Sequence, residues 1–157
     1  MPKFSIDELN ELAAAAFRAH GAADNAARIT AKYLVEADAQ GLGTHGVARV
    51  PAYCDHLKHG RALGDAVPKI ANERGAACLV DAGLGLGFEP TEFALKEAVD
   101  RAAKHGVSFV GVTRSHHCGA LGILLEPVAA RGMVGSRRSM ATCQTAQASL
   151  TEVPKRW

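Results

Sequence analysis

The chain has 157 residues, which is enough for one ordinary domain and too few for two. Its 18 Lys and Arg residues stand against 16 Asp and Glu residues, giving a formal net charge of +2. This near balance excludes the strongly basic surface that nucleic-acid binding usually needs. We therefore expect a small molecule or another protein as the partner, and no nucleic acid.

Cysteine spacing and the length of apolar runs indicate the cellular compartment in which the protein is expected. The four cysteines show no C-x-x-C spacing, and the chain does not open with a charged segment followed by an apolar one. These features favour the cytoplasm, where thiols stay reduced. Charged residues interrupt every apolar run before it reaches the ~20 residues of a membrane span, so we expect a soluble protein without membrane contact.

The first 63 residues have the pattern of a three-helix lobe. Ser5 and Glu8 match the S-x-x-E capping box, so a helix should begin directly after Ser5. Apolar residues at helical spacing, with glycines at the ends, predict helices over residues 6–20, 24–40 and 45–59. Pro51 lies inside the third stretch, where it is tolerated in the first turn and otherwise implies a kink.

Residues 64–135 change to a mixed pattern. Two short β-compatible runs, Lys69–Glu73 and Ala77–Asp81, flank Arg74-Gly75 and predict a hairpin. The elements expected after it are a helix ending at His105-Gly106, a strand over Val107–Thr113 and a helix over Leu121–Ala129. The order β-β-α-β-α predicts an α/β or α+β lobe.

The last part of the chain does not continue this pattern. Met133-Val-Gly135 should begin a further strand, but residues 136–157 are polar and poorly periodic. Loop or disorder is therefore the prediction for this tail.

A first candidate site is the Gly43–Tyr53 segment. His45, Arg49 and Tyr53 are spaced i, i+4, i+8, so on a helix they would line one face. An imidazole moves protons near neutral pH, a guanidinium holds a carboxylate with two hydrogen bonds, and a phenol can orient the same anion. The set predicts a pocket for an organic acid, and the alternative is a solvated polar stripe.

A second candidate site is the corner Arg114–Ala120, which leaves a strand and enters a helix. Neighbouring side chains of an extended segment point to opposite sides, so only one of His116 and His117 should face a given pocket. A metal site of His116, His117 and Cys118 has poor geometry, because tetrahedral sites usually draw spaced ligands from different elements. An acid/base histidine is the preferred interpretation, and a merely hydrogen-bonded corner histidine is the alternative.

The glycine-rich segment Gly83–Gly87 follows a predicted strand, as a dinucleotide-binding loop would. The G-x-G-x-x-G fingerprint needs a glycine at position 88, where Phe88 stands. The segment is therefore interpreted as a turn into the helix near Pro90. No cofactor-binding residue is identifiable in the chain.

Two segments together, residues 37–53 (ADAQGLGTHGVARVPAY) and 114–119 (RSHHCG), resemble the malate/L-lactate dehydrogenase family, which lacks a Rossmann fold. The resemblance covers about Phe4 to Gly135. It implies hydride transfer between NAD or NADP and a small 2-hydroxy or 2-keto acid, in a homodimer. It also implies a three-helix lobe followed by a mixed α/β lobe of the family's own type.

The resemblance further implies residue roles. The family's acid/base histidine falls on His117, although some members are assigned the earlier histidine, here His45. The [Ser/Thr]-His-Gly-x-x-x-Arg pattern, which lines the substrate site, falls on Thr44, His45 and Arg49, with Tyr53 one turn further on.

Family members carry a further half that holds most of the cofactor contacts, and their strand after Gly135 is apolar. We therefore expect a truncated or frame-shifted chain with an incomplete α/β lobe and no dehydrogenase activity of its own. The alternatives are an inactive remnant or interaction module that pairs with a full-length homologue, and a small zinc protein.

Overall fold

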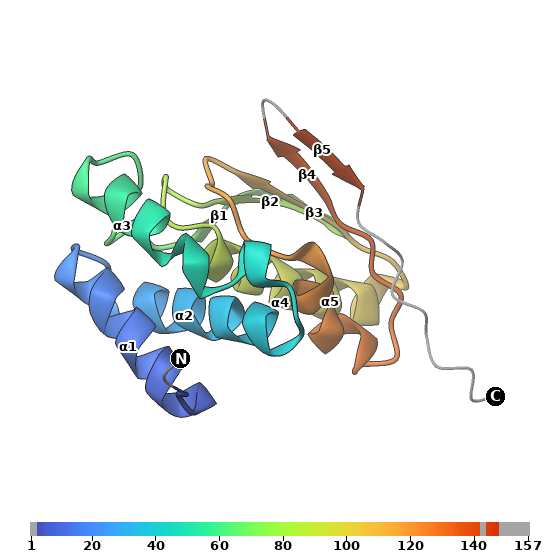
Figure 1. Ribbon diagram of the computed structural model, residues 1–157. Coiled ribbons are helices and arrows are strands. Elements are labelled where there is room, and N and C mark those ends of the chain that lie inside the picture. Colours follow the sequence, from blue (N-terminus) through green and yellow to red (C-terminus); the bar gives the residue numbers. More distant parts are fainter. Residues whose placement is uncertain (1–2, 142–143, 148–157) are drawn as a thin grey trace.

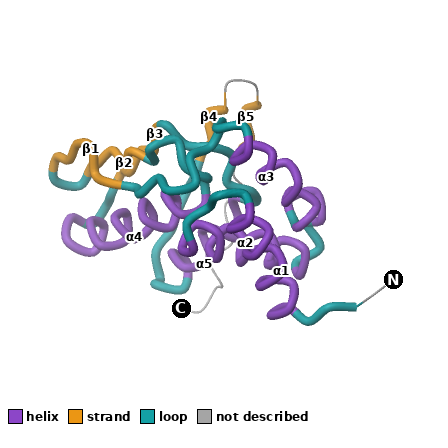
Figure 2. Tube along the Cα trace, turned by 90° about the vertical axis from the view of Figure 1, so that its left-hand side faces the viewer, coloured by secondary structure: helices purple, strands orange, loops and turns teal. Residues whose placement is uncertain are grey.

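The computed structural model describes residues 3–141 and 144–147. Its helices and strands are, in chain order, α1 (Ile6–Ala19), α2 (Asp24–Ala39), the 3-10 turns η1 (Gly43–His45) and η2 (Val47–Arg49), α3 (Val50–Lys58), β1 (Lys69–Arg74), β2 (Ala77–Asp81), α4 (Phe88–His105), β3 (Phe109–Thr113), α5 (Leu121–Ala129), β4 (Arg138–Ala141) and β5 (Gln144–Gln147). Figures 1 and 2 show α1, α2, α4 and α5 packed below the strands. The expected α/β class is confirmed.

Helix α1 begins where the capping box predicts. The Glu8 amide donates to Ser5 Oγ at 3.2 Å, and the Ser5 amide donates to Glu8 Oε2 at 2.8 Å. Two amides of the first turn are thereby satisfied, which stabilises the helix by about 1 kcal/mol. No helix of the described residues is both long and apolar enough to cross a membrane.

The prediction of one helix over residues 45–59 is wrong in its first part. Gly46 is extended, with φ −92° and ψ −154°, so the chain makes two 3-10 turns before α3 begins at Val50. Pro51 lies in the first turn of α3, where its missing N–H costs no hydrogen bond. The Val47 amide donates to Asp38 Oδ2 at 2.8 Å, in place of an intrahelical acceptor.

Three strands form a sheet in the order β1-β2-β3. The predicted hairpin is confirmed as an antiparallel β1/β2 pair with an irregularity between Ile70 and Asn72. Strand β3 pairs with β2 in parallel, which makes α4 the crossover connection. Gly106 ends α4 with a left-handed φ of 80°, and the following strand begins at Phe109, two residues later than predicted.

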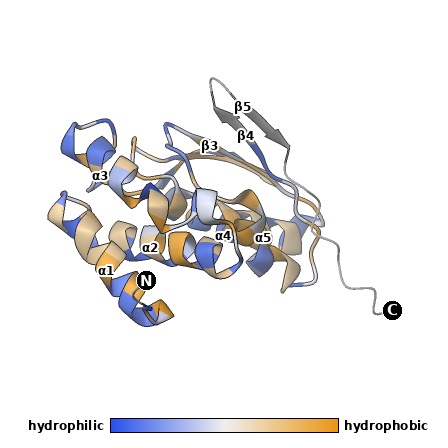
Figure 3. Cartoon of the chain, viewed as in Figure 1, coloured by the Kyte–Doolittle hydropathy of each residue, from blue (hydrophilic) through white to orange (hydrophobic). Residues whose placement is uncertain are grey.

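Two buried clusters hold these elements together. The smaller one packs Cys78 and Val80 of the sheet against Ala94 of α4. The larger one contains Phe17, Leu34, Tyr53, Phe88 and Leu124, so it joins helices from both sides of residue 63. Figure 3 shows apolar residues where α2, α4 and α5 pack together, and polar residues at the end of α3. The expected lobes, 1–63 and 64–135, therefore share one core.

The prediction of loop for the whole tail is also wrong. Strands β4 and β5 pair in antiparallel fashion, with Arg138 opposite Gln147 and Ala141 opposite Gln144. Backbone pairing satisfies amides and carbonyls whatever the polarity of the side chains, so a hydrophobic pattern is a poor guide to such a short pair. The remaining residues of the tail, 142–143 and 148–157, lie outside the described residues.

Candidate active site

The predicted strand-to-helix corner lies between β3 and α5. It begins at Arg114, which has a left-handed φ of 52° although it is not a glycine. The Arg114 carbonyl accepts the Leu84 amide at 2.8 Å, and its Nε donates to Asp81 Oδ1 at 2.9 Å. Asp81 Oδ1 also accepts the Gly83 amide at 2.8 Å. The Gly83 amide and Arg114 hold the pKa of Asp81 below its ordinary value, so a carboxylate anchors the start of the corner.

Gly87 lets the first turn of α4 lie directly against this corner. A Cβ at position 87 would overlap the His116 carbonyl oxygen and lie 2.6 Å from the His117 oxygen. The glycine segment is thus the turn into a helix that the sequence predicts, with α4 beginning at Phe88 and Pro90 in its first turn. Sequence reasoning missed the supporting role of Gly87, because no local signal shows which distant backbone a glycine meets.

His117 lies among side chains from three separate segments. Its Nδ1 is 2.6 Å from the Tyr53 hydroxyl and 3.3 Å from the Gly119 amide. Its ring stacks on the His45 ring with centroids 5.9 Å apart and planes inclined by 25°. Partial burial, Arg49 and His45 lower the pKa of His117, so the imidazole favours its neutral form.

The two 3-10 turns hold His45 in place. Thr44 Oγ1 lies 3.0 Å from His45 Nδ1, and Arg49 Nε donates to the Thr44 carbonyl at 2.7 Å. The Asp38 carboxylate on α2 accepts the Val47 amide, and it lies so close to Gly46 that a Cβ there would overlap it. The loop that carries His45 and Arg49 is therefore fixed by hydrogen bonds between side chains and its own backbone.

The predicted residues come together, but not along one helix face. His45 and Arg49 belong to the 3-10 turns, whereas Tyr53 belongs to α3 and is only 3% exposed. Thr44 and Arg49 are exposed. Tertiary packing around His117, and not the i, i+4 spacing, produces the cluster.

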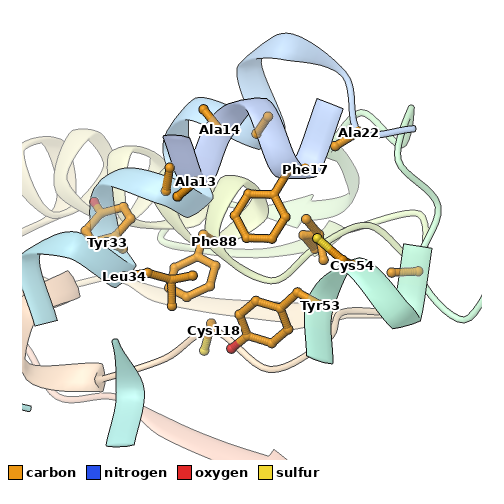
Figure 4. Packing of buried hydrophobic residues seen from close by; sticks show 14 of the residues in the cluster. Ala13, Ala14, Phe17, Ala22, Tyr33, Leu34, Tyr53, Cys54, Phe88 and Cys118 are labelled. Carbon is orange, nitrogen blue, oxygen red and sulfur yellow. The ribbon is translucent and has the colours of Figure 1, made fainter. Parts of the chain in front are cut away.

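His116 faces a different neighbour, in accord with the alternation expected for an extended segment. Its ring lies 5.7 Å from that of His56, which sequence reasoning missed. Burial, Arg61 and His116 lower the pKa of His56. Cys118 is 6% exposed and lies in the core with Phe88 (Figure 4).

The electrostatics of the cluster favour an anion. The charged groups that perturb His117 are Arg49 and His45, both basic. Arg49 forms no ion pair within residues 3–141 and 144–147. In the same part of the chain no group of three His, Cys, Asp or Glu side chains could hold a metal ion. The cluster can bind a carboxylate beside a histidine that exchanges a proton.

Known proteins resemble this chain in sequence and in structure. A sequence model of the family described as malate/L-lactate dehydrogenase matches residues 4–151. A (2R)-3-sulfolactate dehydrogenase (NADP(+)) from Chromohalobacter salexigens is 33% identical over 137 residues, which cover 87% of this chain and 41% of that protein. The structure of malate dehydrogenase from Pyrococcus horikoshii OT3 superimposes with a TM-score of 0.80 at 27% identity, covering 85% of this chain and 38% of that one.

A third similar protein is the Δ1-piperideine-2-carboxylate reductase from Pseudomonas syringae pvar. tomato, with a TM-score of 0.81, 28% identity and coverage of 96% of this chain and 47% of that one. The chain spans about two fifths of the length of the curated relatives it matches. The family match continues to residue 151, so the expectation that the family pattern ends at Gly135 is wrong.

Proposed function

Because the chain belongs to the malate/L-lactate dehydrogenase family, we propose that it forms the substrate-binding and proton-transfer part of an NAD- or NADP-dependent oxidoreductase for a small 2-hydroxy or 2-keto acid. The observation that carries the proposal is the position of His117, between the Tyr53 hydroxyl and the His45 ring and within the field of Arg49. Relatives named for sulfolactate and malate support the substrate class.

His117 is the proton-transfer residue in this proposal. A lowered pKa keeps the imidazole neutral near pH 7, and a neutral imidazole can accept a hydroxyl proton while the acid is oxidised. His45 is the second histidine of the site. Its Nδ1 contacts the Thr44 hydroxyl and its ring stacks on one face of His117, so it forms one wall of the proposed substrate site.

Arg49 and Thr44 are the proposed substrate ligands. Arg49 uses Nε on the Thr44 carbonyl, which leaves its two terminal nitrogens for a carboxylate. Thr44 is exposed beside it and offers a hydroxyl to the same anion. The proposed order of events is capture of the carboxylate by Arg49, followed by proton exchange with His117.

A nicotinamide cofactor would supply or accept the hydride. Among the described residues, the glycine-rich turn 83–87 does not fit its pyrophosphate, because a Cβ position at Gly85 already meets Ala66 and one at Gly87 meets the His116 backbone. The matched residues cover only 41% and 37% of two of the relatives. We therefore propose that the 157 residues bind the acid without turning it over. The homodimer and the cytoplasmic location stay predictions.

The test is a titration of the isotope-labelled chain with malate and with 3-sulfolactate, followed through the ring signals of His117 and His45. Both rings should respond, and Arg49→Gln should weaken binding at least tenfold, equivalent to about 1.4 kcal/mol. Arg131→Gln is the matched control, because Arg131 is an exposed arginine at the end of α5. Equal affinity in the two variants, or a folded chain that binds neither acid, would favour the non-enzymatic alternative.

A further inference from the structure

We propose that Tyr53 is a positioning residue for His117: its hydroxyl holds Nδ1 and leaves Nε2 as the nitrogen that exchanges the proton with the substrate. The inference rests on the proposed function in one respect, that His117 is the acid/base. It replaces the expectation that the Tyr53 phenol contacts the substrate anion.

The Tyr53 ring is fixed by its neighbours. It is 3% exposed and packs edge-on to Phe88 with centroids 6.1 Å apart, and it lies 6.5 Å from Phe17 and 6.4 Å from His56. Figure 4 shows the Tyr53 ring next to Phe17 and Phe88. A phenol with its ring enclosed in this way presents its hydroxyl at one point, and that point is His117 Nδ1.

Two donors share Nδ1, and they differ in what they can do. The Gly119 amide can only donate, so its contact at 3.3 Å requires an unprotonated Nδ1. The Tyr53 hydroxyl can donate to that nitrogen or accept from it. When Nδ1 carries a proton, Tyr53 can therefore rotate its own hydrogen away and accept, whereas the Gly119 amide cannot. Tyr53 therefore suits both states of Nδ1, and only the tautomer whose Nδ1–H donates to Tyr53 leaves Nε2 free to accept a proton.

This property determines how a proton can move. In the imidazolium, Nδ1–H donates to Tyr53 and Nε2–H transfers its proton to the substrate oxygen. The product is a neutral ring whose remaining proton stays on Nδ1, still bonded to Tyr53. In the opposite direction Nε2 accepts the hydroxyl proton and the imidazolium forms again. Burial holds the pKa of Tyr53 far above its ordinary value, so the phenol stays protonated and is not itself the acid.

Tyr33 offers a matched control. It is 5% exposed, stacks on the same Phe88 ring with centroids 5.8 Å apart, and donates its hydroxyl to Glu92 at 2.8 Å. Tyr33→Phe therefore removes a buried hydroxyl from the same core without touching His117. Each variant loses one side-chain hydrogen bond, so the two should lose a similar amount of stability.

The experiment records the ring nitrogens of His117 in the ¹⁵N-labelled 157-residue chain, without substrate. In Tyr53→Phe the Nδ1 signal should move toward that of a nitrogen with a weaker hydrogen bond and broaden, while Tyr33→Phe leaves it in place. An unchanged Nδ1 signal in Tyr53→Phe overturns the inference. This readout needs no ligand, so it separates failure of the inference from failure of the proposed function.

Malate affinity gives the second readout. A positioning residue acts through His117, so Tyr53→Phe should change the affinity for malate less than about threefold, against the tenfold or greater loss in Arg49→Gln. An equal loss in the two variants would show that the phenol is a substrate ligand and would contradict the inference.

Discussion

Replacing Gly87 by alanine tests how the histidine corner is held. The new Cβ would overlap the His116 carbonyl oxygen and lie 2.6 Å from the His117 oxygen and 2.9 Å from the His117 carbonyl carbon. These are backbone atoms, so no side-chain rotation can relieve the overlap, and either α4 or the corner must shift. Overpacking of this kind costs about 1–3 kcal/mol, which lowers Tm by about 2–12 °C in a chain of this length.

Thermal unfolding followed by circular dichroism measures the effect, and Gly122→Ala is the control. Gly122 lies inside α5, and a Cβ there would meet no heavy atom within 4 Å. Alanine at that position should leave Tm unchanged or raise it slightly, since alanine favours helix over glycine. The corner shift should also weaken malate binding in Gly87→Ala and leave it unaltered in Gly122→Ala.

A Gly87→Ala protein with wild-type Tm and wild-type malate affinity would refute this reasoning. It would show that α4 and the corner move apart at no cost, and that the contact does not position His117. A lower Tm with unchanged affinity would keep the packing argument and refute only its link to the site.

Two further predictions concern stability. Burial and neighbouring cations lower the folded-state pKa of His117 and His56, so the unfolded chain binds protons more readily; stability should be complete above about pH 7 and should fall as the pH drops below the unfolded value of about 6.5. Urea midpoints at pH 7.5 and 5.5 measure this loss of stability. His56→Gln should make the loss smaller, whereas His105→Gln, at an exposed histidine, should leave it unchanged. Equal wild-type midpoints at the two pH values would contradict the prediction. Leu34→Ala removes a fully buried side chain of the large core and should lower the free energy of unfolding in urea by about 2–5 kcal/mol. Leu12→Ala, at a residue 58% exposed, should lower it by about 0.5 kcal/mol or less. Similar losses in the two variants would show that this core does not stabilise the fold.

Local chemistry explains which elements the sequence predicts well. The start of α1 depends on Ser5 and Glu8, three residues apart, and the β1/β2 hairpin depends on the runs that flank Gly75. Both elements can be predicted from a few neighbouring residues. The stretch before α3 cannot be predicted in this way, because the Val47 amide donates to Asp38 on α2 and Gly46 adopts an extended conformation beside it.

The site shows the same division. Residue types and the family resemblance predict a site that includes His45, Arg49, Tyr53 and His117. The predicted reason for the convergence of the first three is wrong, since no single helix carries them. The roles of Gly87 and His56 depend on contacts with His116, which lies 29 and 60 residues further along the chain. Such contacts leave no periodicity in the sequence.

The most direct test of the central claim is the pKa of His117 measured by NMR with and without saturating malate, at matched ionic strength. Arg49 and His45 lower this pKa in the free chain, so a carboxylate bound at Arg49 should neutralise part of that field and raise it. By linkage, malate should then bind more tightly to the protonated ring. A pKa that rises on malate binding in the wild type, and does not in Arg49→Gln, is the predicted result. A pKa that stays unchanged or falls would contradict the account of an acid-binding site built around His117.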